Sequence, residues 1–588
     1  MLFKNTKPLQ RNLSKFKYLL ASSMVMSLAL AAPAGAIERH PAPEPTSGKT
    51  SRLPGADSLS DDTDTTPLGV DLRGIVIETS ASAGGSRASG VVVKSDNPFL
   101  DSPELKSQLA AHVGQPLSRA LISTIHNDIV RHMRANDRPL VAVIVPPQEV
   151  TTGTLTLVVI PFVVGEKSVE RIPSDHERTD PQYVLDAVRT GPGDEVVAST
   201  LIEDLTWLNK NPFREVGVIF KQGRLTGTTD LTLTVRDDKP WSAFAGYSNG
   251  GTKATGYDRL FAGGVGELPN AALVSYQFTA SPETIYSGGE LFNFNRNRAY
   301  MSHSLGYFVP FDNRHTLSAT VSYVRTRSKQ TTPFVRDTAV WESKAEYAIP
   351  VSALGPASEV FLGAEAKHQK SGLIFGGTPL APNAIEIYQG FLGLRGNHET
   401  SGHRVAYQVR GVLSPGGLTS ANTSSAFATA SGNIGDKARY AYVNGLVDYR
   451  MPLPKDWSAQ FRAGGQIATG SLPGLEKYAV GGDGSVRGYE TNEVTGDNGL
   501  LLQGELHMPV TRLGPTEVPI DLFAFADYGA VYNHSSGTSQ SVLGAGLGMS
   551  AKLTETVSIS AAWGHAFLAG AATQANSDRF HFGLVAAF

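Results

Sequence analysis

Two short segments near the end of the chain carry side chains that could act on each other. Residues 481–489 read GGDGSVRGY, where the glycines allow a tight fold-back with Arg487 at its tip. Residues 525–529 read FADYG and place a single carboxylate, Asp527, among apolar and small residues. A guanidinium and a carboxylate form a strong, oriented pair when they are shielded from water. Such a pair fixes the position of a loop and performs no covalent chemistry.

Two other patterns resemble enzyme sites but stand in the wrong context. Residues 398–403, HETSGH, resemble a zinc-protease site, but the histidines lack the required spacing of four on a helix and fall at a turn. Residues 544–548, GAGLG, resemble a nucleotide loop but fall inside an expected strand, where small residues indicate close packing. The chain has no cysteine and shows no Ser-His-Asp set. The sequence therefore predicts no catalytic residue, no metal site and no cofactor.

The region that must position Arg487 and Asp527 alternates with a period of two. From residue 241 to 588 helical periodicity is absent, and in 457–467, for example, Phe461 and Ala463 oppose Arg462 and Gln466. Strands of a transmembrane barrel present one face to lipid and the other to a watery lumen. Short and long connections also alternate, which gives about 16 antiparallel strands. The apolar segment 286–294 is assigned to a loop because the alternation of turns otherwise fails.

The faces of individual strands refine this prediction. The longer connections are expected near 280–300, 326–338, 369–384, 415–437, 468–498 and 568–578. Asp527 shares a face with Phe523 and Phe525, while the opposite face carries no charge, so Asp527 is predicted to point into the lumen. The chain ends on the alternating strand RFHFGLVAAF, with Phe588 last. A barrel must close with its last strand, because an open edge in lipid leaves backbone groups unpaired.

The N-terminal part of the chain predicts export and then two small modules. Residues 1–36 have a basic start, an apolar run and a small-residue cleavage site, which is typical of a signal peptide. Residues 37–68 are rich in Pro, Ser and Asp and predict a linker. Residues 69–163 and 164–240 each predict an α/β module with the order β-α-α-β-β. Such a duplicated module is more often an interaction arm than an enzyme.

Overall composition excludes several classes of protein. The chain has 588 residues and a net charge of −3, which argues against a strongly basic nucleic-acid binder. After the signal, no segment has the roughly 20 consecutive apolar residues of a membrane-spanning helix. The sequence therefore predicts a multidomain protein that leaves the cytoplasm and enters the outer membrane as a barrel.

The two motifs carry a resemblance to a known family. Val486-Arg487-Gly488-Tyr489 matches the V-R-G-[FY] loop motif, and Phe525, Asp527 and Gly529 match the F-x-D-x-G wall motif, of the outer-membrane transporters of two-partner secretion. Segments at 146–155 and 211–241 resemble the ends of this family's two polypeptide-transport-associated (POTRA) domains. The resemblance covers residues 69–588 and implies a 16-stranded barrel preceded by two periplasmic α/β POTRA domains. Residues 132–138, HMRANDR, depart from the family's aromatic-rich Y-x-x-x-G-Y stretch.

What the resemblance implies about function is specific. In the family, the loop between strands 11 and 12 folds into the lumen, and its arginine pairs with an aspartate on strand 13. The corresponding loop in this sequence is 468–498. Arg487 and Asp527 are then the gate ion pair of a protein translocase. Its partner is a large secreted exoprotein, captured unfolded in the periplasm and exported without nucleotide hydrolysis. Phe588 resembles the signal read by the barrel assembly machinery. Some members have an N-terminal helix that plugs the lumen, but prolines in 37–68 argue against one here.

Three other functions compete with this hypothesis. A factor that assembles barrels or autotransporters shares the loop motif but usually carries three or more modules. A passive porin needs neither a periplasmic arm nor such a loop. A surface enzyme on a barrel scaffold needs a catalytic set, which this sequence does not provide.

Overall fold

The chain forms two compact units. The structure is a computed structural model that describes residues 38, 53, 59–80, 87–282, 300–329, 334–355, 357–375, 378–400, 402–514 and 517–588. One unit spans Lys49–Asp238, and the other combines Met1–Gly48 with Lys239–Phe588. The predicted signal peptide 1–36 and the segment 286–294 lie outside the described residues. No helix in the described ranges is long and apolar enough to cross a membrane.

The first module packs two helices on a four-stranded sheet. Its elements, in chain order, are β1 (Gly74–Glu78), β2 (Gly90–Lys94), α3 (Pro103–Ala110), α4 (Arg119–Ala135), β3 (Val141–Ile144) and β4 (Thr154–Pro161). Both helices begin where a serine accepts a backbone N–H, Ser102 from Leu105 at 3.3 Å and Ser118 from Leu121 at 3.2 Å. The apolar face of α4 covers a core with Leu155 and Leu157 of β4. The predicted order missed one strand, because β2 pairs in parallel with β1 at the sheet edge.

The second module repeats the plan with three strands. Its elements are β5 (Val163–Arg171), α5 (Pro181–Ala187), α6 (Ala198–Leu208), β6 (Arg214–Gln222) and β7 (Thr228–Asp237). The sheet order is β5-β7-β6, so β5 and β6 are edge strands. Leu201, Leu205 and Leu208 of α6 are buried against apolar residues of the sheet. The predicted order of strands and helices in this module is confirmed.

Asp137, at the end of α4, joins the two modules. Helix α6 lacks a side-chain cap of its own, and Asp137 supplies one by accepting the backbone N–H of Ser199 at 2.9 Å and also its hydroxyl. Its backbone oxygen accepts the N–H of Ala198 at 3.1 Å. Asp137 has a φ of 68°, a conformation that Asp and Asn tolerate better than other residues with a side chain. The following residue, Arg138, pairs with Glu195 at 2.7 Å.

We expect Asp137→Ala to loosen α6 by about 1 kcal/mol, the usual contribution of a capping side chain. In the full-length protein, amides of 198–208 should then exchange with solvent about fivefold faster by hydrogen-exchange mass spectrometry. Asp137→Asn keeps the backbone preference and an accepting oxygen, so its exchange should stay close to that of the wild type. Equal exchange in wild type and Asp137→Ala would show that the cap contributes nothing.

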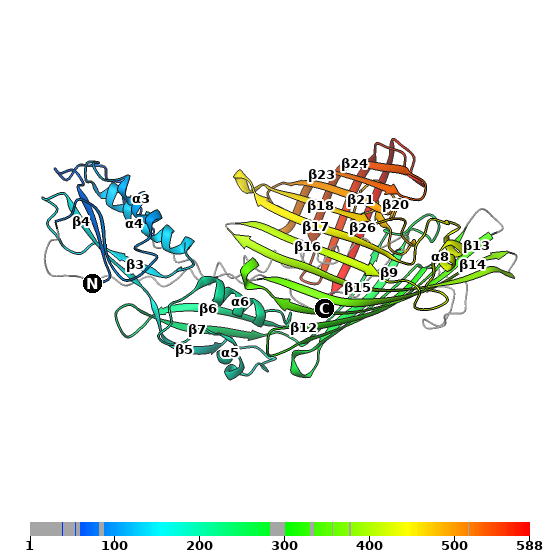
Figure 1. The fold of residues 1–588 in the computed structure, drawn as a ribbon, viewed down its shortest axis with the longest axis horizontal. Helices are drawn as coiled ribbons and strands as arrows, with labels where there is room; N and C mark the ends of the chain where they lie inside the picture. The colour runs from blue at the N-terminus through cyan, green and yellow to red at the C-terminus, as the bar shows by residue number, and fades with distance from the viewer. Residues whose placement is uncertain are drawn as a thin grey trace. The chain divides into compact units, whose positions relative to one another are not determined.

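Sixteen antiparallel strands close the barrel of the other unit (Figure 1). Their segments are β8 (Trp241–Ser248), β9 (Arg259–Glu267), β10 (Leu273–Ala280), β11 (Tyr300–Pro310), β12 (Thr316–Lys329), β13 (Phe334–Pro350), β14 (Ser358–Phe375), β15 (Thr378–Thr400), β16 (His403–Ser414), β17 (Tyr440–Pro452), β18 (Ser458–Ala468), β21 (Asn498–His507) continued by β22 (Thr511–Leu513), β23 (Val518–Asn533), β24 (Thr538–Lys552), β25 (Val557–Ala566) and β26 (Ser577–Ala587). β21 and β22 both pair with β23 and count as one strand. The last strand, β26, pairs with the first, β8. The predicted barrel and its strand number are confirmed.

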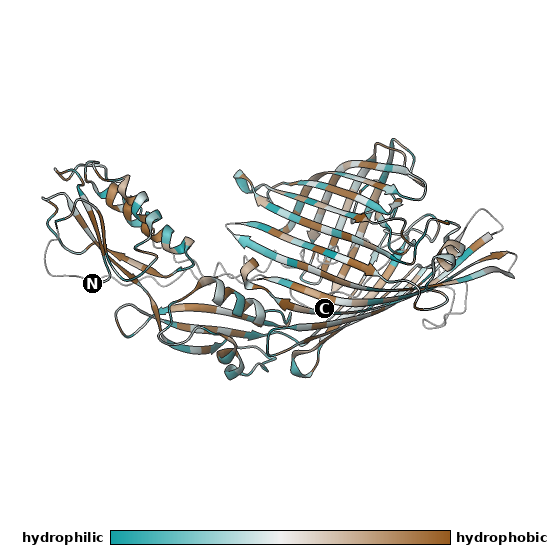
Figure 2. Ribbon diagram, in the orientation of Figure 1, coloured by the Kyte–Doolittle hydropathy of each residue, from teal (hydrophilic) through white to brown (hydrophobic). Residues whose placement is uncertain are grey.

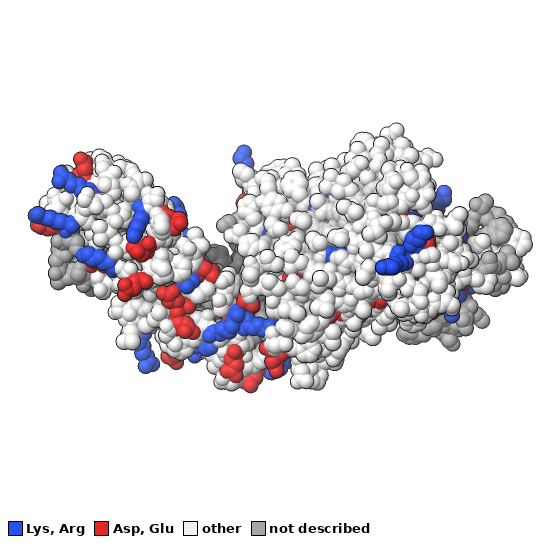
Figure 3. Space-filling model, viewed as in Figure 1, with Lys and Arg blue, Asp and Glu red and all other residues white. Residues whose placement is uncertain are grey.

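The two faces of the barrel wall differ as the alternation predicts. Phe461 and Leu502 are half exposed on the outside, whereas Arg462 and Gln503, their chain neighbours, point inward. Apolar and polar residues alternate along the strands in Figure 2. On the face shown in Figure 3, charged side chains crowd the α/β modules and are scarce across the middle of the barrel wall. This outer band suits lipid.

Two of the predicted long loops are largely strand. In the region 326–338, β12 ends only at Lys329 and β13 begins already at Phe334. In the region 369–384, β14 ends only at Phe375 and β15 begins already at Thr378. Their outer ends carry polar pairs across the strands, such as Arg325 with Asp337 at 2.9 Å. Polar residues on both faces hide the period of two, which explains why the sequence indicated loops. The loops at 415–437, 468–498 and 568–578 are confirmed, and the first contains helix α8 (Ser424–Ser431).

Candidate functional site

The loop at 468–498 connects strands 11 and 12 and folds back onto the lumen face of the wall. It contains a small hairpin of β19 (Tyr478–Val480) and β20 (Val494–Gly496). Its apolar residues Val480, Val486 and Tyr489 are buried against inward-facing residues of the wall. Gly481 and Gly482 adopt φ angles of 117° and 97°, which other residues rarely reach, and so allow the fold-back.

Arg487 lies at the centre of a buried charge cluster. Its Nε and Nη2 donate to the two carboxylate oxygens of Asp527 at 2.7 and 2.8 Å, and its backbone N–H donates to the same carboxylate at 3.1 Å. Its Nη1 donates to Glu505 of β21 at 2.6 Å. Arg487 is 4% exposed and Asp527 1% exposed. Breaking such a pair costs more than breaking a surface pair, because the remaining charge stays buried and unpaired.

Every named position of the wall motif contacts the loop. The ring of Phe525 lies beneath the Arg487 guanidinium, 3.7 Å from its central carbon to the ring centre, which is a cation–π contact. Asp527 supplies the carboxylate. Gly529 leaves room for Val480 and Val486, because a Cβ there would lie 2.8 and 3.0 Å from them. The spacing F-x-D-x-G places all three on the lumen face of one strand.

The other residues of the loop motif also contact the barrel wall. Val486 is fully buried in the apolar cluster that joins the loop to the wall. Gly488 has a φ of 97° and donates its N–H to Nε2 of His581 on β26 at 3.2 Å. The hydroxyl of Tyr489 lies 2.9 Å from the carbonyl oxygen of Leu543 and 2.8 Å from that of Leu568. The motif therefore joins the loop to strands β24 and β26 and to the β25–β26 connection.

Two wall glycines form a cradle for the loop backbone. A Cβ on Gly544 of β24 would lie 2.0 Å from the backbone oxygen of Arg487, and one on Gly564 of β25 would lie 2.5 Å from the nitrogen of Gly488. Gly546 makes room in the same way for the ring of Phe525. The GAGLG pattern lies within strand β24, as expected, and its glycines serve close packing.

Glu505 was not predicted as part of the site. It pairs with Arg487 and, through its other oxygen, with His507 at 3.0 Å. Gln503, two residues earlier, donates to the backbone oxygen of Ser485 in the loop at 2.6 Å. In the barrel register Gln503 lies opposite Asp527. A search for polar residues on the lumen face of the strand beside Asp527 would have found both.

A second unpredicted contact brings the N-terminal end of the chain to the barrel. Glu38 makes a bidentate pair with Arg259 of β9, at 2.9 and 2.6 Å. Arg259 is fully buried and also lies over the ring of Tyr300, 4.3 Å from the guanidinium carbon to the ring centre. The sequence assigned residue 38 to a linker, where nothing in the pattern marks such a partner. The described part of 59–68 contains no helix, and the rest of the possible plug segment lies outside the described residues.

The distal half of the loop reaches other loops of the barrel. Glu493 accepts the backbone N–H groups of Ala572 and Thr573 at 2.6 and 2.7 Å. Glu490 accepts the hydroxyl of Tyr257 at 2.9 Å, and the hydroxyl of Thr491 donates to Gly250. The loop therefore contacts the β8–β9 and β25–β26 connections as well as the wall.

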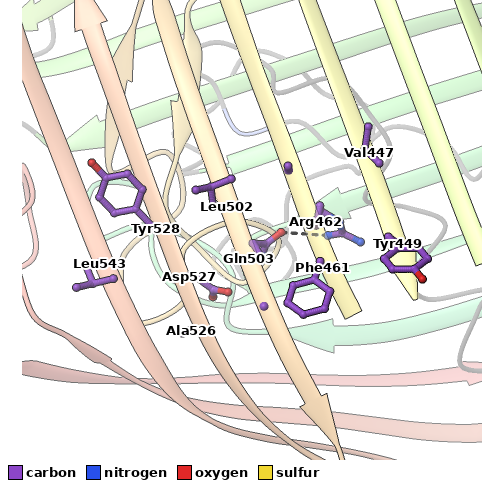
Figure 4. Close-up of a pocket in the computed structure, with 12 residues that line it drawn as sticks. Val447, Tyr449, Phe461, Arg462, Leu502, Gln503, Ala526, Asp527, Tyr528 and Leu543 are labelled. Atoms are coloured by element: carbon purple, nitrogen blue, oxygen red, sulfur yellow. Dashed lines mark hydrogen bonds between the residues drawn. The ribbon is translucent and has the colours of Figure 1, made fainter. Parts of the chain in front are cut away.

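The wall around Asp527 is apolar on its other side. A pocket there is lined by Tyr449, Phe461, Leu502, Tyr528 and Leu543. Gln503 lies between Asp527 and Arg462 and is joined to Arg462 by a hydrogen bond (Figure 4). The outer face thus matches lipid and the inner face holds the polar site.

The remaining sequence candidates fall away from this cluster. Phe588 closes the barrel seam, where its backbone exchanges hydrogen bonds with Ala243 at 2.8 and 3.1 Å. His398 and His403 lie on either side of the β15–β16 turn. Within the described ranges, no group of three or more His, Cys, Asp or Glu residues could hold a metal ion.

Comparisons with known proteins agree on one kind of molecule. Residues 399–551, which include both motifs, match the family model described as haemolysin secretion/activation protein ShlB/FhaC/HecB. The heme/hemopexin transporter protein HuxB of Haemophilus influenzae (strain 86-028NP) is 22% identical over 499 residues, which is 80% of this chain and 82% of HuxB. The outer membrane transporter CdiB of Dickeya dadantii (strain 3937) is 22% identical over 358 residues, 58% of this chain and 59% of CdiB.

Solved structures show the same fold. CdiB from Escherichia coli superposes with a TM-score of 0.59 at 16% identity, covering 100% of both chains. CdiB from Acinetobacter baumannii gives 0.55 at 15% identity, again over 100% of both chains.

Proposed function

We infer that this chain, an outer-membrane transporter of two-partner secretion by its family model, its relatives and its closed barrel, captures an unfolded partner exoprotein and passes it outward through the lumen. The observation that carries this inference is the loop seated in the lumen, held by Arg487 through a buried pair with Asp527 and Glu505. A passive pore would also have no need of the two α/β modules that precede the barrel.

Capture is the task of the two α/β modules, which we assign to residues 69–163 and 164–240 as periplasmic POTRA domains. We propose that the exoprotein adds a strand to an open sheet edge, which gives affinity through main-chain hydrogen bonds with little demand on sequence. In the second module, the Asn209 side chain already pairs with both backbone groups of Val216 on β6, at 2.7 and 2.8 Å. The rest of β6, whose Ile219 is 42% exposed, is the edge that suits an incoming strand.

The Arg487–Asp527 pair acts in this mechanism as a gate that positions the loop. An unfolded chain needs the space that the loop occupies, so the pair must release or the loop must shift as a unit. No nucleotide is consumed, and folding of the exoprotein outside the cell makes transport one-way. We assign residues 1–36 as a cleaved signal peptide, and we propose that Phe588 presents the barrel to the assembly machinery.

Deletion of the gene is expected to leave the partner exoprotein in the periplasm, and re-expression of this chain should restore its secretion. The measurement is an immunoblot of the exoprotein in medium and periplasm, together with the amounts of unrelated outer-membrane barrels. A function in barrel assembly predicts the opposite pattern, in which those unrelated barrels decline and the exoprotein declines only as a consequence.

A further inference from the structure

Glu476 lies in the same lumen loop as Arg487 but contacts a different part of the wall. One carboxylate oxygen lies 2.6 Å from Nζ of Lys367 on β14. The other accepts the hydroxyl of Tyr442 on β17 at 2.8 Å and the side-chain amide of Gln389 on β15 at 3.0 Å. Glu476 is 4% exposed. A carboxylate carried by the loop thus fills a polar site built by three strands.

A second layer of side chains fixes those partners. Gln389 also donates to Glu365 at 2.6 Å and accepts the hydroxyl of Tyr440 at 2.9 Å. Glu365 forms an ion pair with Arg410 at 2.6 Å. Two carboxylates therefore face two cations, Lys367 and Arg410, with no net charge left over. Loss of the Glu476 charge would leave this buried group with an excess positive charge.

The two anchors of the loop lie on separate sectors of the wall. Those of Glu476 are on strands β14, β15 and β17, and those of Arg487 are on β21 and β23. The two sets share no strand, and β18 separates β17 of the first set from β21 of the second. The loop is therefore held to the wall at two places on different strands, and a single anchor would leave the other part of the loop free to move.

We propose that Glu476 is a second positioning residue of the lumen loop, and that the loop clears the lumen only after both the Glu476 and the Arg487 anchors have released. This inference rests on the proposed function for its purpose. Its physical content, a loop held at two places, can be measured without any exoprotein. With both anchors in place, thermal motion that breaks one leaves the loop tethered by the other.

The chain offers a clean way to observe the loop. It contains no cysteine, so Gly484→Cys introduces a single thiol for a spin label. A Cβ at position 484, near the loop tip, meets no atom within 4 Å. In full-length protein reconstituted into lipid vesicles, the spectrum should show a mostly immobile label. Glu476→Gln and Arg487→Ala should each at least double the mobile fraction, and the double variant should exceed the sum of the two.

A matched control comes from another buried glutamate of the lumen wall. Glu346 pairs with Lys344 and Arg395 at 2.8 and 2.5 Å, all within the wall, and is 4% exposed. Glu346→Gln removes a comparable charge and should leave the label immobile. Tyr442→Phe, which removes one hydrogen bond and keeps the ring, should produce a smaller increase than Glu476→Gln and add little to it, because both act on one anchor.

Several outcomes would overturn the second anchor. They are an unchanged spectrum for Glu476→Gln in a correctly folded barrel, an equal increase for Glu346→Gln, or strictly additive effects of Glu476→Gln and Arg487→Ala. Folding is checked by heat-dependent migration of the barrel. Failure of the proposed function looks different, because the label would respond as expected while secretion of the exoprotein stayed normal in both single variants.

Discussion

Replacement of Arg487 by alanine is expected to reduce secretion of the partner exoprotein by about tenfold or more, with the barrel present at its normal level. Asp527 and Glu505 both face this guanidinium, at 2.7 and 2.6 Å, and its loss leaves two buried carboxylates without their common cation. Breaking a buried pair in this way costs roughly 3–5 kcal/mol. Only about 1.4 kcal/mol is needed for a tenfold change in the population of the correctly seated loop.

Asp527→Ala should have a smaller effect than Arg487→Ala. In that variant Arg487 keeps its pair with Glu505 and its contact with the Phe525 ring, so no charge is left without a partner. This ranking follows from the cluster of three charges. A simple pair of Arg487 and Asp527 would predict that the two substitutions are equally harmful.

The measurement is the ratio of exoprotein in the medium to exoprotein in the periplasm, with barrel abundance checked in isolated outer membranes. Arg325→Ala is the matched control, because Arg325 pairs with Asp337 within the wall at 2.9 Å. Normal secretion by Arg487→Ala at normal abundance would contradict the gate assignment. Equal loss in the control would show that loss of any paired charge of the barrel lowers secretion and that the loop is not special.

The barrel could be predicted from sequence because a single local rule produces it. Each strand must place apolar residues outward and polar residues inward, so a period of two recurs from Trp241 to Phe588. The rule failed where it ceases to apply, at the outer ends of β12 to β15, which carry polar residues on both faces. The same rule did not detect β2, because its three consecutive valines do not alternate with polar residues.

The site was predictable only in part, for a different reason. Arg487 and Asp527 stand in short motifs, whereas Glu476 and Lys367 lie 109 residues apart with no pattern around either. Glu38 and Arg259 lie 221 residues apart. Such pairs depend on how the wall curves and where the loop folds back. The position of a charged residue in a strand predicts which face of the wall carries it. It does not predict which loop residue will contact it.

The role of two wall glycines in the site also could not be predicted from the sequence. In the sequence, Gly544 and Gly564 look like small residues in strands, and the period of two shows only that they face the lumen. The structure gives their purpose, since the loop backbone passes where a Cβ would be. This close approach leads to a second large effect that involves no charge at all.

Gly544→Ala is expected to displace the loop and to lower secretion to a similar degree as Arg487→Ala. The added Cβ would lie 2.0 Å from the backbone oxygen of Arg487, a contact that neither backbone can relieve without moving. Overpacking of this kind costs about 1–3 kcal/mol, which corresponds to roughly a 5–150-fold shift in the equilibrium of the loop. Gly564→Ala should act in the same direction, because its Cβ would lie 2.5 Å from the nitrogen of Gly488.

Gly504→Ala provides the control for this experiment. Gly504 faces outward on β21, and the nearest atom to its added Cβ lies 3.9 Å away, so secretion should stay normal. The barrel abundance of all three glycine variants is measured alongside secretion. Normal secretion by Gly544→Ala would mean that the loop tolerates a shift of its backbone without losing its function.

Combining Gly544→Ala with Arg487→Ala separates seating of the loop from other effects of either change. If both act by unseating the same loop, the double variant should secrete about as little as the worse single variant, because a loop that has already left its cradle has no pair to lose. Independent effects would instead multiply. In that case Gly544→Ala would lower secretion by a route separate from the seating of the loop by Arg487.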